Sequence, residues 1–334
     1  MNIKKLLAVI FAVALLALVG CGDNANTTIP TATQPVASAR VHVAAISGPS
    51  GVALTPLMAQ QDVNDTVNTY IFEVVSTPEE IVNKLSTGAA DIAALPTNLA
   101  ATLYQRTAGG VQMLGVTMRG VLSIVERGNS ITNVADLRGK TIYTTGLGVN
   151  PEFILRHVLE QNGLKPGVDV QIEFLTDNAE LSAKLAAGLI DVAMTPEPVT
   201  STVLSKDADL RVALSLSDAW TALEGDSELL MSCLVVRTAF LADHAEAVEL
   251  FMADCAASIA AVQDDVPAAA ALCAQYGLIP NAAIAERAIP GCNLGWRVGS
   301  DMKNAIRGYY DVLFAADPKS LGGKLPGDDF YYGT

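Results

Sequence analysis

Apolar residues beyond position 39 gather in short runs that polar turn residues separate. The runs at 40–46 and 121–125, for example, are rich in Val, Ile and Ala and stop close to a Gly. Stretches with the apolar spacing of a helix follow such runs. Short strands alternating with helices are typical of βαβ units on a parallel sheet. The pattern therefore predicts an α/β fold.

The chain also repeats part of itself at an offset of 100 residues. Chance would give roughly one or two identities over so short a stretch, so a repeated structural unit is indicated. Residues 40–50 lie over 140–150 at the same offset, and each copy predicts strand, Gly-containing loop, helix, strand, helix, strand. We therefore expect two α/β lobes of about 100 residues each. The eight identical pairs are Glu80 and Glu180, Lys84 and Lys184, Leu85 and Leu185, Gly88 and Gly188, Asp91 and Asp191, Ala93 and Ala193, Pro96 and Pro196, and Thr102 and Thr202.

The N-terminus resembles a bacterial lipoprotein signal peptide. Lys4 and Lys5 precede an apolar run over 6–19, and a small residue precedes Cys21. This run is shorter than the roughly 20 residues that span a bilayer, so a permanent membrane helix is the weaker alternative. We expect residues 1–20 to be removed and Cys21 to carry a lipid that holds the protein at the outer face of the cytoplasmic membrane. Residues 21–39 have the composition of a flexible tether.

Composition limits the partners of the remaining chain. Hydrophobic residues make up 51% of the sequence, yet no later run is long enough for a second membrane segment, so they belong to a buried core. The formal charge is −14, and removal of Lys4 and Lys5 makes it more negative. A chain this acidic is not expected to bind nucleic acid or anionic lipid headgroups with its globular part.

The cysteines and histidines do not indicate a metal centre. His42, His157 and His244 lie far apart, and the sequence contains no Cys-x-x-Cys. We expect neither a metal nor a cofactor. Outside the cytoplasm, four cysteines can pair in three ways, of which we favour a bond between Cys273 and Cys292; buried free thiols are the alternative. The four are Cys233, Cys255, Cys273 and Cys292.

Two Gly-containing loops follow the first strand of each repeat. Ligands of open α/β sheets collect at the carboxyl ends of strands, where loops run into helix N-termini. Loops 47–51 and 144–150 offer hydroxyl and amide groups beside Gly. Ordinary helix capping is the alternative role, and a phosphate loop is disfavoured because no Lys-Ser/Thr ending follows. The candidate ligand-binding residues here are Ser47, Gly48, Ser50, Thr144, Thr145 and Asn150.

The loops after the later strands add further candidates. Thr97 and Asn98 follow Pro96, and Glu197 follows Pro196. Glu197 suits a ligand amine or heterocyclic N–H, although capping of the next helix is the favoured alternative. Trp220 is a candidate to cover a flat ring, with core packing as its alternative. No nucleophile or acid–base pair for catalysis is visible in the sequence.

Four segments together resemble the type II extracytoplasmic solute-binding proteins of ABC importers, in the branch similar to thiamine-precursor, alkanesulfonate and nitrate binders. The resemblance implies two lobes joined by two hinge crossovers, each with a mostly parallel sheet flanked by helices. Its implied boundaries are 40–120 plus 230–334 for lobe 1, and 121–229 for lobe 2. The segments are Gly88-Ala-Ala-Asp91-Ile-Ala, Ile131-Thr-Asn-Val-Ala-Asp136-Leu-Arg-Gly139-Lys-Thr-Ile142, Leu189-Ile-Asp191-Val-Ala, and Cys233-Leu-Val-Val-Arg237-Thr-Ala-Phe240-Leu-Ala-Asp-His.

The resemblance further implies a solute receptor. The lobes would close on a small polar, heterocyclic or anionic solute, and the closed monomer would deliver it to a membrane permease driven by an ATPase. An enzyme on the same fold, of the menaquinone-pathway lyase or pyrimidine-precursor synthase type, is one alternative. A sensory receptor is another. The sequence leaves the identity of the solute open.

Overall fold

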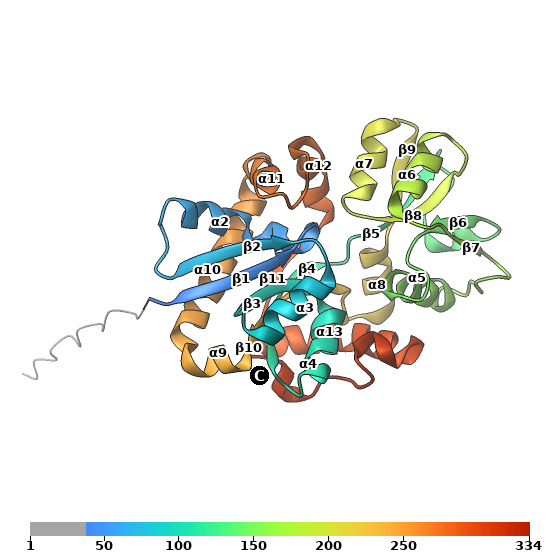
Figure 1. Cartoon of the computed structure of the whole chain (residues 1–334). Helices are drawn as coiled ribbons and strands as arrows, with labels where there is room; N and C mark the ends of the chain where they lie inside the picture. Colours follow the sequence, from blue (N-terminus) through green and yellow to red (C-terminus); the bar gives the residue numbers. More distant parts are fainter. Residues whose placement is uncertain (1–37) are drawn as a thin grey trace, which may run out of the picture. The chain divides into compact units, whose positions relative to one another are not determined.

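The computed structural model describes residues 38–334, which form two sheets with helices packed on their faces (Figure 1). One sheet has six strands in the order β11-β4-β10-β3-β1-β2, and the other has five in the order β7-β6-β8-β5-β9. The strands of the six-stranded sheet are β1 (Arg40–Ile46), β2 (Thr69–Val75), β3 (Ile92–Pro96), β4 (Val111–Arg119), β10 (Leu230–Arg237) and β11 (Leu294–Arg297). Those of the five-stranded sheet are β5 (Leu122–Arg127), β6 (Thr141–Thr144), β7 (Gln171–Phe174), β8 (Val192–Pro196) and β9 (Leu210–Ser215).

Helices connect and cover these strands. We call the six-stranded sheet with its helices the first lobe, and the five-stranded sheet with α5 to α8 the second lobe. The helices of the first lobe are α2 (Thr55–Asp62), α3 (Pro78–Thr87), α4 (Thr97–Arg106), α9 (Thr238–Asp243), α10 (Ala245–Asp264), α11 (Val266–Gln275), α12 (Ala282–Gly291) and α13 (Gly299–Ala316). Those of the second are α5 (Asn150–Gln161), α6 (Asn178–Ala186), α7 (Val199–Lys206) and α8 (Leu216–Glu224). The short 3-10 turns are η1 (Pro49–Leu54), η2 (Val134–Leu137), η3 (Pro318–Leu321) and η4 (Asp328–Phe330).

The two sheets share one topology, as the internal repeat predicts. In the first lobe β1 pairs parallel with β2 and β3, and in the second β6 pairs parallel with β7 and β8. The neighbour of β3 is β10, and the neighbour of β8 is β5; both run antiparallel. The predicted α/β fold of two lobes is therefore confirmed, and each sheet is mixed, with most of its strands running in one direction. The reason is that β5 and β10 each follow a crossing from the other lobe.

The two crossings lie side by side at Gly120. The chain leaves the first lobe after β4 and returns after α8 into β10. A Cβ at Gly120 would lie 2.4 Å from Oγ of Ser217 and 3.1 Å from Cβ of Leu229 on the returning segment. The hydroxyl of Ser217 donates to the carbonyl oxygen of Gly120 at 3.0 Å. Only glycine permits this approach, so position 120 holds the connections between the lobes together.

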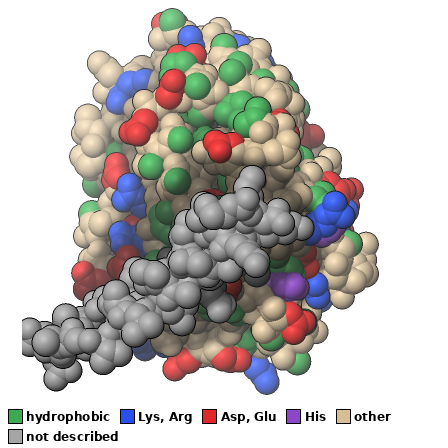
Figure 2. All heavy atoms as spheres, turned by 90° about the vertical axis from the view of Figure 1, so that its left-hand side faces the viewer, with side chains coloured by type: hydrophobic (Ala, Val, Ile, Leu, Met, Phe, Trp, Pro, Cys, Tyr) green, Lys and Arg blue, Asp and Glu red, His purple; other side chains and the backbone are tan. Residues whose placement is uncertain are grey.

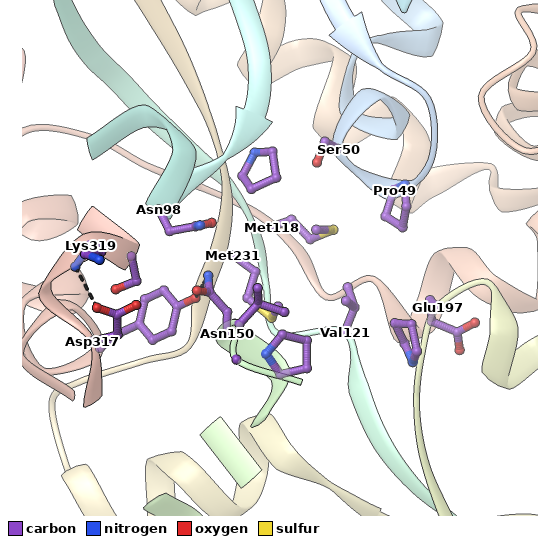
Figure 3. A pocket seen from close by; sticks show the side chains of 17 residues that line it. Pro49, Ser50, Asn98, Met118, Val121, Asn150, Glu197, Met231, Asp317 and Lys319 are labelled. Carbon is purple, nitrogen blue, oxygen red and sulfur yellow. Dashed lines mark hydrogen bonds between the residues drawn. The ribbon is translucent and has the colours of Figure 1, made fainter. Parts of the chain in front are cut away.

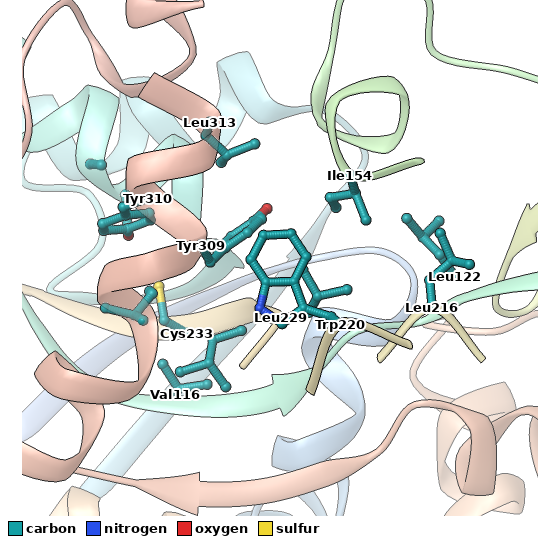
Figure 4. Packing of buried hydrophobic residues seen from close by; sticks show 14 of the residues in the cluster. Val116, Leu122, Ile154, Leu216, Trp220, Leu229, Cys233, Tyr309, Tyr310 and Leu313 are labelled. Atoms are coloured by element: carbon teal, nitrogen blue, oxygen red, sulfur yellow. The ribbon is translucent and has the colours of Figure 1, made fainter. Parts of the chain in front are cut away.

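A continuous apolar core reaches from one lobe to the other. Its residues include Leu122, Ile154 and Trp220 of the second lobe together with Tyr309 and Leu313 of α13 (Figure 4). The rings of Trp220 and Tyr309 meet edge to face with their centroids 6.0 Å apart. Helix α13 also packs on α5, and α12 packs on α7. The C-terminal helices therefore contact both lobes.

One face of the molecule carries charges of both signs. On the face that Figure 2 shows, acidic side chains are scattered singly and basic ones lie among them. Within residues 38–334, no helix combines the length and apolar character needed to cross a membrane. The predicted signal peptide, the lipidated Cys21 and most of the tether lie outside the described residues.

Candidate functional site

A cavity of about 550 Å³ takes its wall from both lobes (Figure 3). Loops at the carboxyl ends of strands supply most of the wall, which is where an open α/β sheet places its ligands. Two further contributions come from the connections between the lobes and from the C-terminal segment. The lining residues are Pro49, Ser50, Pro96, Asn98, Met118, Val121, Gly148, Val149, Asn150, Pro151, Pro196, Glu197, Met231, Tyr309, Asp317, Lys319 and Ser320.

The 100-residue offset relates the two sides of this cavity. Ser50 at the start of η1 corresponds to Asn150 at the start of α5, and both are buried. Pro96 at the end of β3 corresponds to Pro196 at the end of β8. The cavity therefore lies between matching strand ends of two copies of one unit. This arrangement is the one that the repeat led us to expect.

Apolar side chains from the connections form the middle of the cavity. Met118 is the penultimate residue of β4, Val121 precedes β5, and Met231 lies in β10. Figure 3 shows these three between the polar residues of the two sides. Methionine is flexible and polarisable, so this wall can adapt to the body of an organic solute.

One side of the cavity carries amides and the C-terminal segment. The amide of Asn150 donates to the hydroxyl of Tyr309 at 3.1 Å, which joins α5 of the second lobe to α13. Asn98 lies in the first turn of α4, whose N-terminus has no side-chain cap. Asp317 and Lys319 lie close to Asn98 in Figure 3. The backbone N–H groups at this helix start can bind an acceptor group.

Glu197 occupies the opposite side of the cavity (Figure 3). It is 8% exposed, and its Oε2 accepts the backbone N–H of Ser201 in the first turn of α7 at 3.2 Å. Burial raises the pKa of its carboxyl above the ordinary value, and the hydrogen bond to Ser201 opposes that change. Glu197 therefore caps α7, as the favoured alternative predicts, and lines the cavity at the same time.

Several predicted loop residues lie behind the wall rather than in it. The Thr144 hydroxyl donates to the carbonyl oxygen of Met194 at 3.1 Å, and that of Thr97 donates to Leu230 at 2.6 Å. The Thr145 hydroxyl donates to Oδ1 of Asn178 at 3.0 Å. These threonines hold strand ends and loops in place. None of the three lines the cavity.

Ser47 and Gly48 also lie outside the lining. The backbone N–H of Ser47 donates to Val75, and that of Gly48 donates to Leu278, at 2.8 and 2.9 Å. Both groups are thus used to fix the loop between β1 and η1. Of the candidates predicted from the two Gly-containing loops, Ser50 and Asn150 reach the cavity.

The structure corrects the ring-covering role considered for Trp220. Its side chain is fully buried in the core, and its Nε1 lies 3.3 Å from Oγ of Ser227 (Figure 4). It stacks at a tilt on His157, with ring centroids 4.8 Å apart, and does not line the cavity. Core packing, the alternative drawn from the sequence, is what the structure shows. The apolar face of α8 points inward, and the indole of Trp220 lies on that face.

Cys273 and Cys292, which the sequence favours as a disulfide pair, are free thiols in the structure. All four cysteines of the described chain are buried and free. Burial raises the pKa of the Cys273 thiol to about 11 and that of Cys292 further. Such thiols are poor nucleophiles at neutral pH. Within residues 38–334 no group of His, Cys, Asp and Glu has the arrangement of a metal site.

Sequence reasoning missed the lining residues that lie outside the predicted loops. Met118 in β4, Val121 before β5 and Met231 in β10 lie in or beside the connections between the lobes, which no local pattern marks as part of a cavity. Tyr309, Asp317, Lys319 and Ser320 come from the C-terminal segment, which lies outside the internal repeat. The repeat offset, applied to Ser50 and Asn150, was the one signal that placed lining residues on both sides.

Comparisons with known proteins agree with this geometry. A family model described as "ABC transporter, phosphonate, periplasmic substrate-binding protein" matches residues 60–254, more than half of the chain. A comparison with curated protein sequences finds no match.

Solved structures share the fold at low sequence identity. An ABC transporter protein from Parabacteroides distasonis has a TM-score of 0.73 and 22% identity, over 87% of this chain and 98% of that one. The periplasmic aliphatic sulphonate binding protein SsuA from Escherichia coli has a TM-score of 0.66 and 17% identity, over 87% and 90%. The alkanesulfonate-binding protein from Xanthomonas axonopodis pv. citri, bound to MOPS, has a TM-score of 0.54 and 18% identity, over 87% and 96%.

Proposed function

The chain belongs to the family of periplasmic substrate-binding proteins of ABC transporters, and we propose that its solute binds in the cavity between the two lobes. The observation that carries the proposal is the wall itself, because matching strand ends of both lobes contribute to it. A solute that touches both sides stabilises only the state in which the lobes meet. Membership of the family implies a location outside the cytoplasm and delivery of the solute to an ABC permease.

We propose that four of the predicted residues contact the solute. Ser50, Asn98, Asn150 and Glu197 line the cavity and offer one hydroxyl, two amides and one carboxylate. Apolar wall residues lie between them, which suits a small polar, heterocyclic or anionic solute with an organic body. The protein would bind this solute without transforming it, because its family and its structural neighbours are transporter binding proteins.

The proposed organisation of the chain follows the order of its strands. Lobe 1 comprises 40–120 plus 230–334, lobe 2 comprises 121–229, and the connections at Gly120 and before β10 act as the hinge. The protein acts as a monomer that docks on the permease in its closed state. An ATPase subunit drives the release of the solute into that permease.

The proposed anchor rests on the sequence before residue 39. Residues 1–20 would be removed, and a lipid on Cys21 would hold the tether and the two lobes at the outer face of the cytoplasmic membrane. Metabolic labelling with a radioactive fatty acid tests this directly. We expect label on the wild-type protein and none on Cys21→Ser, and equal labelling of both would contradict the anchor.

A thermal-unfolding screen tests the binding role. Protein expressed from the full-length sequence and freed of bound solute would be heated with amines, amino-heterocycles, phosphonates, sulfonates and amino acids in turn. A solute at 100 times its dissociation constant adds about 2.7 kcal/mol to the unfolding free energy, which raises the Tm measurably. We expect such a rise with one class of compounds. No rise with any class would count against a solute-binding cavity.

A further inference from the structure

The charge of the cavity wall differs from what a phosphonate site requires. Three of its lining residues are of charged types, and two of them, Glu197 and Asp317, are acids. The third is Lys319, whose side chain is exposed at the C-terminal segment. No arginine lines the cavity within the described chain. A doubly charged anion would therefore enter a mostly apolar wall with a net negative charge, which is unfavourable.

Glu197 is the buried acid of this wall, and few groups of the described chain stabilise its negative charge. Its hydrogen-bond partners there all belong to Ser201, whose backbone N–H reaches Oε2. Burial raises the pKa of this carboxyl, and no basic side chain acts to lower it. A buried carboxylate without a positive partner is costly, so a bound cation or N–H donor would relieve that cost.

The neighbouring helix end adds to the negative character of this side. A Cβ at Gly291, the last residue of α12, would lie 2.6 Å from Oε1 of Glu197. The carboxylate therefore lies against the C-terminus of a helix from the other lobe, where the helix dipole is negative and favours cations. The charge of Glu197 also contributes, after burial, to the raised pKa of the adjacent Cys292 thiol. No residue larger than glycine fits at 291 while the carboxylate stays in place.

Resting on the proposed solute-binding function, we propose that this cavity takes a compact organic solute that presents a protonated amine, an amidine or a heterocyclic N–H to Glu197. The apolar wall of Met118, Val121 and Met231 would contact its body, and Asn98 and Asn150 would hydrogen-bond its far end. Phosphonates and sulfonates that lack an N–H donor would be excluded. The substrate class of this chain thus differs from the one named in the family description.

Calorimetric titration of protein expressed from the full-length sequence tests this specificity. The donor probes are 4-aminopyrimidine, imidazole and cyclohexylamine, and the anion probes are methylphosphonate, phenylphosphonate and ethanesulfonate. We expect binding of at least one donor probe and of no anion probe. Glu197→Gln should weaken donor binding about tenfold or more, since a hydrogen bond to a charged group is lost. Glu173→Gln, the same change at an exposed residue of β7 outside the cavity, should leave binding within about twofold.

Gly291→Ala provides a second variant should Glu197→Gln fail to fold. Its methyl group displaces the carboxylate without removing it, and donor binding should again weaken. Gly295→Ala is its control, because nothing lies within 4 Å of a Cβ there. Binding of the anion probes with no effect of Glu197→Gln would overturn the donor specificity and leave the solute-binding function standing. Binding of no probe at all would contradict both.

Discussion

The two lobes agree in many residues that build the fold and differ in the polar residues that face the cavity. Helices α3 and α6 begin alike: Thr77 and Asp177 accept the N–H groups of Glu80 and Glu180, at 3.3 and 2.8 Å. Each glutamate returns a bond, accepting the N–H of Ser76 or Thr176 at 2.9 Å. These reciprocal caps explain why Glu80 recurs as Glu180.

The repeated aspartates show the same agreement. Asp91 precedes β3 and binds Arg237 at the end of β10, at 2.8 Å. Asp191 precedes β8 and lies 3.6 Å from Arg127 at the end of β5. In both lobes an arginine on the antiparallel strand thus meets the aspartate of the repeat. The shared residues secure the strand that arrives from the other lobe.

Position 97 and its counterpart 197 show the difference. Thr97 is fully buried, and its hydroxyl donates to the carbonyl oxygen of Leu230. Glu197 lines the cavity with a carboxyl whose pKa is raised by burial. The repeat thus keeps its caps, its ion pairs and the prolines that end β3 and β8, but it changes the residue that follows each proline. The cavity is chemically asymmetric for that reason.

The largest effect that we expect comes from a residue that the first lobe does not repeat. Gly120 lies 100 positions before Trp220, so the first lobe has no counterpart of this indole. Trp220→Ala should lower the unfolding free energy by about 4 kcal/mol, because a fully buried ring leaves a cavity. Denaturant unfolding measures this. A small loss of stability combined with a loss of solute binding would contradict this and indicate that Trp220 contacts the solute.

The two aspartates correspond in the repeat, but they should contribute differently to the unfolding free energy. Asp91 is buried and also accepts the N–H of His42 at 3.0 Å, whereas the Asp191 side chain is 69% exposed. Asp91→Ala should cost about 3 kcal/mol, because it leaves Arg237 without its partner. Asp191→Ala should cost less than about 1 kcal/mol. Equal losses in urea unfolding would contradict the difference in burial.

The pH dependence of stability should distinguish Glu197 from Glu126 in the same lobe. Burial alone would raise the pKa of Glu126, but bonds from Ile131, Ser130 and Arg211 lower it. Its ionised form therefore favours the folded state, and Glu126→Gln should be less stable than wild type at pH 7. That deficit should shrink as the pH falls through the lowered pKa of Glu126.

Glu197 should behave in the opposite sense. Its raised pKa means that ionisation opposes folding above that pKa, so Glu197→Gln should have a higher Tm than wild type at pH 7. The advantage should disappear as the pH falls toward the ordinary value of 4.5. Melting curves of solute-free protein at several pH values provide the test. A Tm advantage that grows toward low pH would contradict the assigned direction.

The smallest effect concerns the matched caps. Thr77→Ala and Asp177→Ala should each lower the unfolding free energy by about 1 kcal/mol, since each removes one acceptor from a helix start. Similar losses in the two variants would support the equivalence of α3 and α6. If only one variant lost stability, the two helix caps would be alike in sequence but not in their contribution to the unfolding free energy.

Much of the fold could be predicted because local signals repeat. Gly88 and Gly188 end their helices at positive φ, and Pro96 and Pro196 end their strands. The antiparallel strands β5 and β10 lack such a signal, since their direction depends on a crossing between lobes. For this reason the sequence predicts mostly parallel sheets but does not identify β5 and β10 as the antiparallel strands.

The cavity could be predicted in part for the same reason. Ser50, Asn98, Asn150 and Glu197 follow strand ends that the repeat locates. Thr144 was a poor candidate because a hydroxyl near a strand end is equally suited to bond a neighbouring strand, as it does with Met194. Lys319 had no signal, because its position depends on how the C-terminal segment packs on α4.

Blocking the cavity tests the central claim most directly. Val149 lines the cavity and is 51% exposed, so Val149→Trp can place an indole at the wall with little effect on the core. Val168 of the same lobe is 68% exposed and lies outside the lining, so Val168→Trp is the matched control. Calorimetric titration with a solute found in the screen should show binding abolished in Val149→Trp and unchanged in Val168→Trp. Equal binding by both variants would contradict solute binding between the lobes.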